Sequence, residues 1–134
     1  MKRLALTMFV TAVILTVFAS YAGAFTMSEK VVVSNQLIAI ARTPAGGYSA
    51  DQRINMVNDR LAYILGYEPL APRDIYARAL PGGSRAIMVG NRLLITVTPA
   101  DARANNTTVA GLTRVWLQHA RQAIPQARPN ANLA

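Results

Sequence analysis

The segment NRLLITVTPADA, residues 91–102, holds the polar side chains whose types and spacing come closest to a chemical site. Thr96 and Thr98 alternate along an apolar run, and Asp101 follows Pro99, where the run must end. A carboxylate such as Asp101 could act as a ligand or a general base if its pKa is perturbed and a substrate lies within reach. Aspartate in turns more commonly accepts hydrogen bonds from nearby backbone N–H groups. The pattern therefore favours a structural joint over a site for Thr96, Thr98 and Asp101.

Few other residues in the chain are suited to catalysis. His119 is the only histidine and cysteine is absent, so thiol catalysis is excluded and a zinc site, which needs three or four ligands, is not expected. The residue types of a Ser–His–Asp arrangement are present: Ser34, Ser49, Ser84, Asp74 and His119. No serine, however, lies in a nucleophile elbow of the form G-x-S-x-G. We therefore expect a non-enzymatic protein without a cofactor, and keep a small hydrolase with an unrecognised site as an alternative.

The basic charge of the chain is spread along the sequence. The formal net charge is +8, and it comes almost entirely from arginine, because Lys2 and Lys30 are the only lysines. The arginines form no basic run. Nucleic-acid-binding proteins usually gather such charge on one face or along one helix. We therefore do not expect a nucleic-acid partner.

Two pairs of arginines lie seven residues apart in segments with helical periodicity. These are Arg53 and Arg60 in the first segment, and Arg114 and Arg121 in the second. If both helices pack on one face of a sheet, the four side chains form a basic outer surface. That surface would meet anionic lipid or cell-wall polymer, with about 1 kcal/mol of attraction per arginine near a membrane. The alternative is an ordinary solvated helix face.

The N-terminus has the organisation of a secretory signal peptide. Met1-Lys2-Arg3 is a short basic head, Leu4–Phe18 is uncharged and almost wholly apolar, and Ala22-Gly23-Ala24 has the small-x-small form that signal peptidase recognises. We predict a signal peptide over residues 1–24, cleaved after Ala24, and a secreted or periplasmic protein that contacts the membrane only during export. The alternative is an uncleaved helix that anchors the protein, since Leu4–Ala24 is long enough to span a bilayer.

Periodicity and turn residues predict the elements that carry the candidate residues. Strands are expected at Val31–Val33, Leu37–Ala41, Ile75–Leu80, Arg85–Val89 and Arg92–Thr98. Helices are expected from Ser49 to Gly66 and from Thr107 or Thr108 to Pro125. Ser49 and Gln52 have the spacing of a capping box, in which each side chain accepts a hydrogen bond from the other's backbone N–H. Residues 100–106 are expected to be an irregular link.

The resulting order is ββ-α-βββ-α, which predicts an α+β fold. We expect a small antiparallel sheet of about five strands with two helices packed on one face. Residues 25–124 form a single domain in this interpretation, and residues 125–134 form a flexible tail. An exposed edge strand at Val31–Val33 would allow strand pairing with another chain.

Four segments resemble a known domain. They are VVVSNQLIAIA, YSADQRINMVNDRLAYIL, RAIMVGNRLLITVTPADA and LTRVWLQHARQAI, in this order over most of residues 31–124. The chain resembles the extracytoplasmic N-terminal domain of some bacterial small-conductance mechanosensitive channel-like proteins, notably cyanobacterial ones. The resemblance implies a periplasmic accessory module, here free-standing because no second hydrophobic segment follows Ala24. It implies no catalytic residues.

The function expected from the sequence is therefore a secreted or periplasmic binding or sensory module whose ligand the residues do not name. An envelope protein is the partner that the resemblance implies. The alternatives are a protein that binds anionic lipid or cell-wall polymer through the four helix arginines, and the small hydrolase.

Overall fold

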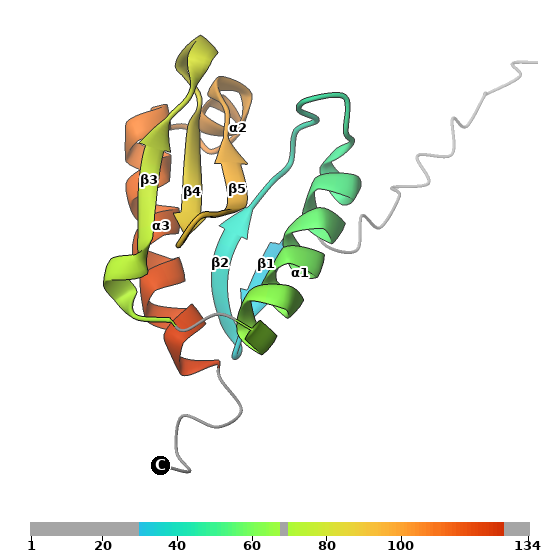
Figure 1. Cartoon of the computed structure of the whole chain (residues 1–134). Helices are drawn as coiled ribbons and strands as arrows, with labels where there is room; N and C mark the ends of the chain where they lie inside the picture. Colours follow the sequence, from blue (N-terminus) through green and yellow to red (C-terminus); the bar gives the residue numbers. More distant parts are fainter. Residues whose placement is uncertain (1–29, 68–69, 128–134) are drawn as a thin grey trace, which may run out of the picture.

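The computed structural model describes residues 30–67 and 70–127 (Figure 1). The predicted signal peptide, its cleavage site and the end of the predicted tail lie outside the described residues. In the part of the chain that is described, no helix is both long and apolar enough to cross a membrane.

The first two strands form the predicted hairpin. β1 (Lys30–Val33) pairs antiparallel with β2 (Gln36–Ile40). Ser34 and Asn35 join them with φ angles of 48° and 62°, which is the left-handed backbone that a two-residue hairpin turn requires. Val31 and Val33 are buried and β1 packs against α1, whereas Val32 is exposed and β2 is the one strand paired with β1 in the described residues.

The first long helix, α1 (Ala50–Tyr67), begins at the predicted capping box. The backbone N–H of Gln52 donates to Ser49 Oγ at 3.2 Å, and the backbone N–H of Ser49 donates to Gln52 Oε1 at 2.9 Å. Its apolar stripe is buried in the core and consists of Ile54, Val57, Leu61 and Ile64.

Three further strands form a second antiparallel sheet in the order β3-β4-β5. Their bounds are β3 Ile75–Ala79, β4 Arg85–Val89 and β5 Arg92–Val97, close to the predicted ones. Short 3-10 turns at Pro72–Asp74 and Pro81–Gly83 lead into β3 and β4. Gly90, with a φ of 58°, makes the tight turn between β4 and β5.

A short helix replaces the irregular link predicted for residues 100–106. α2 (Pro99–Ala104) begins directly after β5, with Pro99 at its first position, where proline fits because that N–H has no partner in a helix. Thr98 caps α2 by accepting a hydrogen bond from the backbone N–H of Asp101.

The last helix, α3 (Val109–Gln126), is capped by Thr108, whose Oγ1 accepts from the backbone N–H of Gly111 at 3.0 Å. Pro125 does not stop the helix before it reaches Gln126, contrary to expectation. Since Pro125 lies in the last turn, its missing N–H removes a single hydrogen bond. Trp116, in the middle of α3, is buried in the core.

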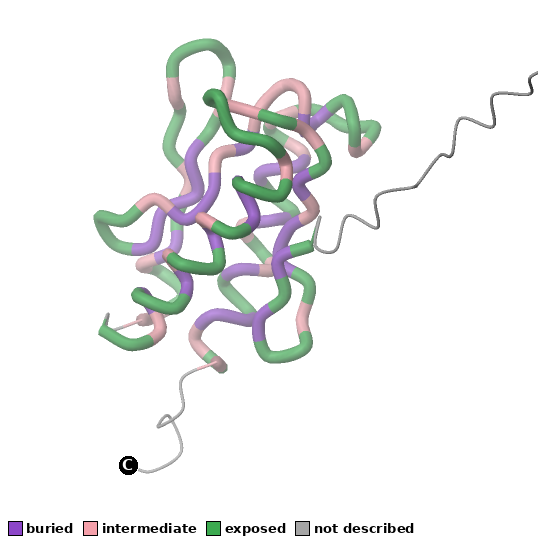
Figure 2. Tube along the Cα trace, turned by 90° about the vertical axis from the view of Figure 1, so that its right-hand side faces the viewer, coloured by how far each residue is buried: buried purple, intermediate pink, exposed green. Residues whose placement is uncertain are grey.

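The α+β class and the five antiparallel strands are confirmed. The strands, however, form two sheets instead of one. α3 packs against β2 and all three strands of the second sheet, whereas α1 packs against β1 and β5. The two long helices therefore do not share one face of a single sheet. In Figure 1, α3 lies behind the three-stranded sheet, whereas α1 packs beside β1 and β5. The buried segments gather in the interior of the molecule (Figure 2), where residues of both long helices and both sheets form one core.

Candidate functional site

Asp101 lies at the centre of a buried hydrogen-bond network. Its side chain is 0% exposed. Oδ1 accepts from Arg53 Nη1 at 2.8 Å and from Thr43 Oγ1 at 2.7 Å. Oδ2 accepts from Arg53 Nη2 at 2.8 Å and from both the backbone N–H and the hydroxyl of Thr98 at 2.9 Å. Both oxygens of the carboxylate therefore accept hydrogen bonds from several protein donors.

Arg53 connects this carboxylate to two backbone segments. Its Nη1 also donates to the carbonyl of Thr43 at 2.6 Å, and its Nη2 donates to the carbonyl of Thr96 at 2.9 Å. The guanidinium, which belongs to α1, thus contacts three other parts of the fold: the segment that follows β2, the strand β5 and the helix α2.

The pKa of the Asp101 carboxyl lies below its usual value. Burial alone would raise this pKa, but the hydrogen bonds from Arg53, Thr43 and Thr98, together with the charge of Arg53, outweigh burial. A carboxylate with a lowered pKa and hydrogen bonds to both oxygens is a weak base. The structure therefore places Asp101 in a structural joint, to which Thr98 contributes a helix cap and Thr96 a backbone carbonyl.

The four helix arginines do not form the common basic surface predicted from the sequence. Arg53 is only 7% exposed. Arg60 Nη1 donates to the carbonyl of Leu94 at 3.1 Å, so both arginines of α1 reach the outer edge of β5. Arg121 Nε donates to the carbonyl of Ile75 at 2.7 Å, on the edge strand at the other side of the sheet. Arg53, Arg60 and Arg121 thus donate to backbone carbonyls at the edges of the sheet, and the sequence periodicity did not reveal these contacts.

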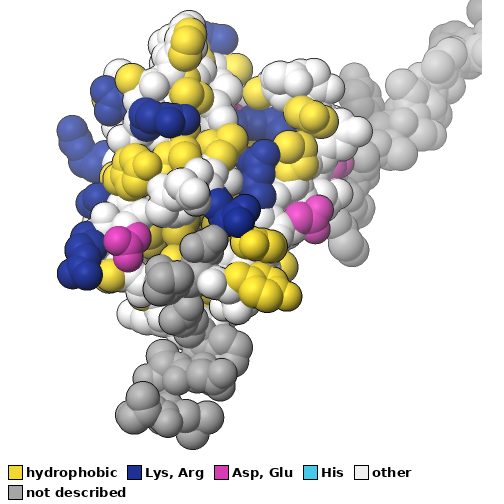
Figure 3. Space-filling view, in the orientation of Figure 1, with side chains coloured by type: hydrophobic (Ala, Val, Ile, Leu, Met, Phe, Trp, Pro, Cys, Tyr) yellow, Lys and Arg dark blue, Asp and Glu magenta, His cyan; other side chains and the backbone are white. Residues whose placement is uncertain are grey.

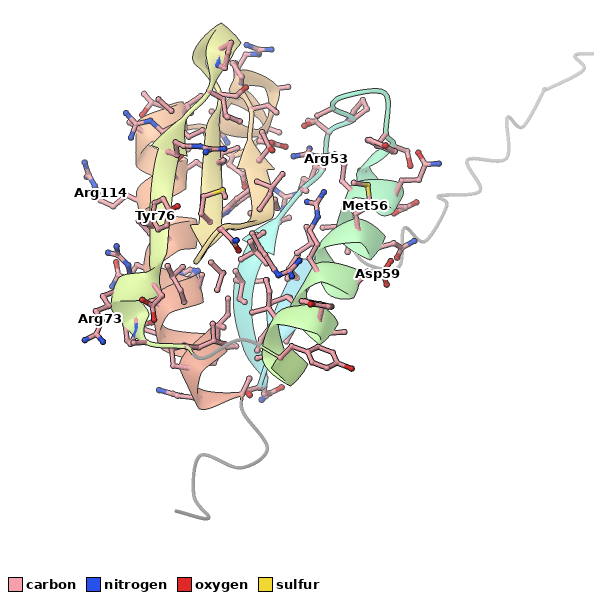
Figure 4. All side chains as sticks on the ribbon, in the orientation of Figure 1. Arg53, Met56, Asp59, Arg73, Tyr76 and Arg114 are labelled. Atoms are coloured by element: carbon pink, nitrogen blue, oxygen red, sulfur yellow. The ribbon has the colours of Figure 1, made fainter. Side chains whose placement is uncertain are left out.

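A groove of about 460 Å³ lies between α1, the loop before it and the front of the three-stranded sheet. Its lining is mostly apolar, and Arg53 and Arg60 contribute charge to its wall. The apolar lining includes Tyr48, Met56, Val57, Leu80, Leu93 and Ile95. Figure 3 shows hydrophobic side chains gathered on this face with basic side chains among them, and Figure 4 shows Arg53 between α1 and β5.

A second hollow of about 430 Å³ continues the groove along α1. Arg60 and Leu93 line both hollows, so the two lie next to each other along α1. At the far end the guanidinium of Arg92 lies 4.0 Å from the centre of the Tyr63 ring. Sequence reasoning missed this groove. The only available signal was Met56, an apolar residue on α1 outside the stripe that packs into the core.

The residues of the possible Ser–His–Asp arrangement are not brought together. Ser49 caps α1, and Ser84 lines the groove. Asp74 Oδ2 accepts from the backbone N–H of Ala71 at 2.8 Å. His119 lines a separate hollow of about 300 Å³ between β2 and α3. Among residues 30–67 and 70–127, no three His, Cys, Asp or Glu side chains gather as a possible metal site.

Comparison with known proteins gives one family. The family described as "Domain of unknown function (DUF8459)" matches residues 30–127, which are nearly the residues that the structure describes. No curated protein and no solved structure matches the chain.

Proposed function

The chain belongs to the DUF8459 family, and we propose that it is a non-enzymatic binding module of the cell envelope. Its ligand is an elongated, mainly apolar molecule with one negatively charged group, and it lies in the groove along α1. The observation that carries this proposal is the apolar groove with Arg60 at its middle.

The size and lining of the groove support a small ligand. Binding sites for small molecules are typically concave, a few hundred Å³ in volume and mainly apolar, with a few polar groups that fix orientation. The first hollow has this composition. The second hollow, which adds Asp59, Tyr63, Asn91 and Arg92 to the lining, lies next to it along α1 and suits a ligand that is longer than it is wide.

Arg60 is the reason for proposing that the ligand carries a negatively charged group. An arginine carries five N–H donors, and the hydrogen bond to the carbonyl of Leu94 uses one of those of Arg60. The side chain is partly exposed and lines both hollows. A carboxylate or phosphate at this position would receive charge-assisted hydrogen bonds from the remaining donors.

The envelope location rests on the predicted signal peptide at residues 1–24. The resemblance of residues 31–124 to a periplasmic domain of channel-like proteins points to the same compartment. Both remain predictions, and an amphiphilic ligand with an acidic group is a common type of molecule at an envelope surface.

The experiment is a titration of the purified protein with dodecanoate and with dodecanol, followed by calorimetry. We expect dodecanoate to bind more tightly, because dodecanol offers no charge to Arg60. Met56→Glu should abolish binding by placing a negative charge in the groove, while Asn55→Glu, which makes the same charge change at the exposed neighbouring position, should not. Equal loss in both variants, or no binding of either probe, would overturn the proposal.

A further inference from the structure

The strand β3 is one edge of the three-stranded sheet, since the order is β3-β4-β5. The carbonyl of Asp74 accepts from Gly90, and the N–H of Leu80 donates to the carbonyl of Ser84, so the even-numbered residues turn their backbone groups toward β4. Backbone direction alternates along a strand of an antiparallel pair. The N–H and C=O groups of Ile75, Ala77 and Ala79 therefore point away from the sheet.

The two edges of this sheet are closed to different extents. At β5, Arg60 and Arg53 of α1 donate to the carbonyls of Leu94 and Thr96. At β3, Arg121 of α3 donates to the carbonyl of Ile75 only. Within the described part of the chain, no side chain bonds to the outward groups of Ala77 or Ala79. The part of β3 at Ala77 and Ala79 is thus an open strand edge, to which another strand could pair.

Basic side chains lie along this edge strand (Figure 4). Arg78 lies in β3 and Arg73 lies just before it, and both are exposed. Arg114 lies seven residues before Arg121 on the same stripe of α3, which is roughly 10 Å along the helix, and it is also exposed. Within residues 30–67 and 70–127, none of these three side chains has a hydrogen bond or an ion pair. Figure 4 shows Arg73, Tyr76 and Arg114 along β3, on the side of the molecule away from α1.

We propose that the edge of β3 binds an extended acidic segment of a partner protein, which adds to the sheet as a further strand. Main-chain hydrogen bonds from Ala77 and Ala79 would supply affinity, and carboxylates of the partner would meet Arg73, Arg78 and Arg114. A second copy of this chain does not fit the edge, because two basic edges placed side by side repel each other. This partner site is separate from the groove, which lies along α1 at the other edge of the sheet.

The test uses two synthetic peptides of eight residues, one alternating valine with glutamate and the other alternating valine with lysine. Each is added to the purified, ¹⁵N-labelled protein. We expect the glutamate peptide alone to shift the amide signals of Ala77 and Ala79 and to slow their hydrogen exchange. The affinity should fall with added salt, because the contributing charges are exposed.

Matched variants separate the strand edge from general charge attraction. Ala77→Pro removes an outward N–H and no ladder bond, a change that edge strands accommodate, and it should abolish binding. Arg114→Gln should weaken binding about 2- to 5-fold, as for an exposed charge pair, whereas Arg103→Gln on α2 should have no effect. Equal binding of the lysine peptide, failure of the glutamate peptide to bind, or shifts centred on the groove would each overturn the proposal. If Ala77→Pro fails to fold, the comparison of Arg114→Gln with Arg103→Gln decides.

Discussion

Arg53 and Asp101 form a buried bidentate ion pair although 48 residues separate them, with both N–O distances at 2.8 Å. The pair joins the long helix that follows the hairpin to the short helix that follows the second sheet. It also holds the carbonyls of Thr43 and Thr96. The guanidinium therefore connects two halves of the fold that share no ladder of backbone hydrogen bonds.

Removing one partner of this ion pair should be costly. Arg53→Met leaves the Asp101 carboxylate buried with fewer donors, and it should lower the free energy of unfolding by about 3–5 kcal/mol. Chemical denaturation with urea measures this value. Arg103→Met, an exposed arginine on α2, is the control and should stay within about 0.5 kcal/mol of the parent. A small effect of Arg53→Met would mean that the pair does not hold the two halves together.

The stability of the protein should fall in acid because of Asp101. Its pKa is lowered in the folded state, so its contribution is fully present above the unfolded-state pKa, about 3.9. That contribution is lost as pH falls through the lower folded-state pKa, because the unfolded chain then binds more protons than the folded one. Urea midpoints measured between pH 7 and pH 2 should decline below about pH 4. Asp101→Asn should be less stable at pH 7 and should show a shallower decline; an unchanged decline would assign the acid sensitivity to other groups.

The hydroxyl of Thr98 should matter more than its methyl group. It accepts from the backbone N–H of Asp101 at 3.1 Å and donates to the Asp101 carboxylate at 2.9 Å. Thr98→Ala should therefore lower the free energy of unfolding by about 1–2 kcal/mol, as for loss of a helix cap. Thr98→Ser keeps the hydroxyl and should retain most of the stability. Similar losses in both variants would show that packing of the methyl group, and not the cap, is what position 98 supplies.

Elements set by local signals could be predicted from the sequence. Ser34 and Asn35 tolerate the left-handed backbone of the hairpin turn, and Ser49 and Gln52 cap α1 through contacts three residues apart. The short helix α2 was missed because six residues are too few to show a helical period, even though Thr98 and Asp101 have the spacing of a capping box. Local signals thus gave the elements but not the shortest of them.

The arrangement of the elements depends on contacts that no local pattern encodes. Arg53 has the position of a solvated residue on α1, and only the packing of α1 beside β5 brings it to Asp101. The groove next to Met56 is likewise lined by residues of α1 and of β5, which only the tertiary fold brings together. The candidate site therefore results from tertiary structure, whereas the structural character of Asp101 followed from its place after a strand.

Arg60 provides the sharpest test of how the groove distinguishes ligands. Its guanidinium donates to the carbonyl of Leu94 and lines both hollows. Arg60→Leu should lower the affinity for dodecanoate by about 10-fold, which corresponds to about 1.4 kcal/mol for a charge-assisted hydrogen bond. The same variant should leave the affinity for dodecanol nearly unchanged, since the apolar wall remains. Arg114→Leu, which removes an equal charge beside β3, should alter neither affinity. Parallel losses for both ligands in Arg60→Leu would indicate that the loss of the bond to β5 had deformed the groove, and would remove the assigned role of Arg60 in selecting a negative group.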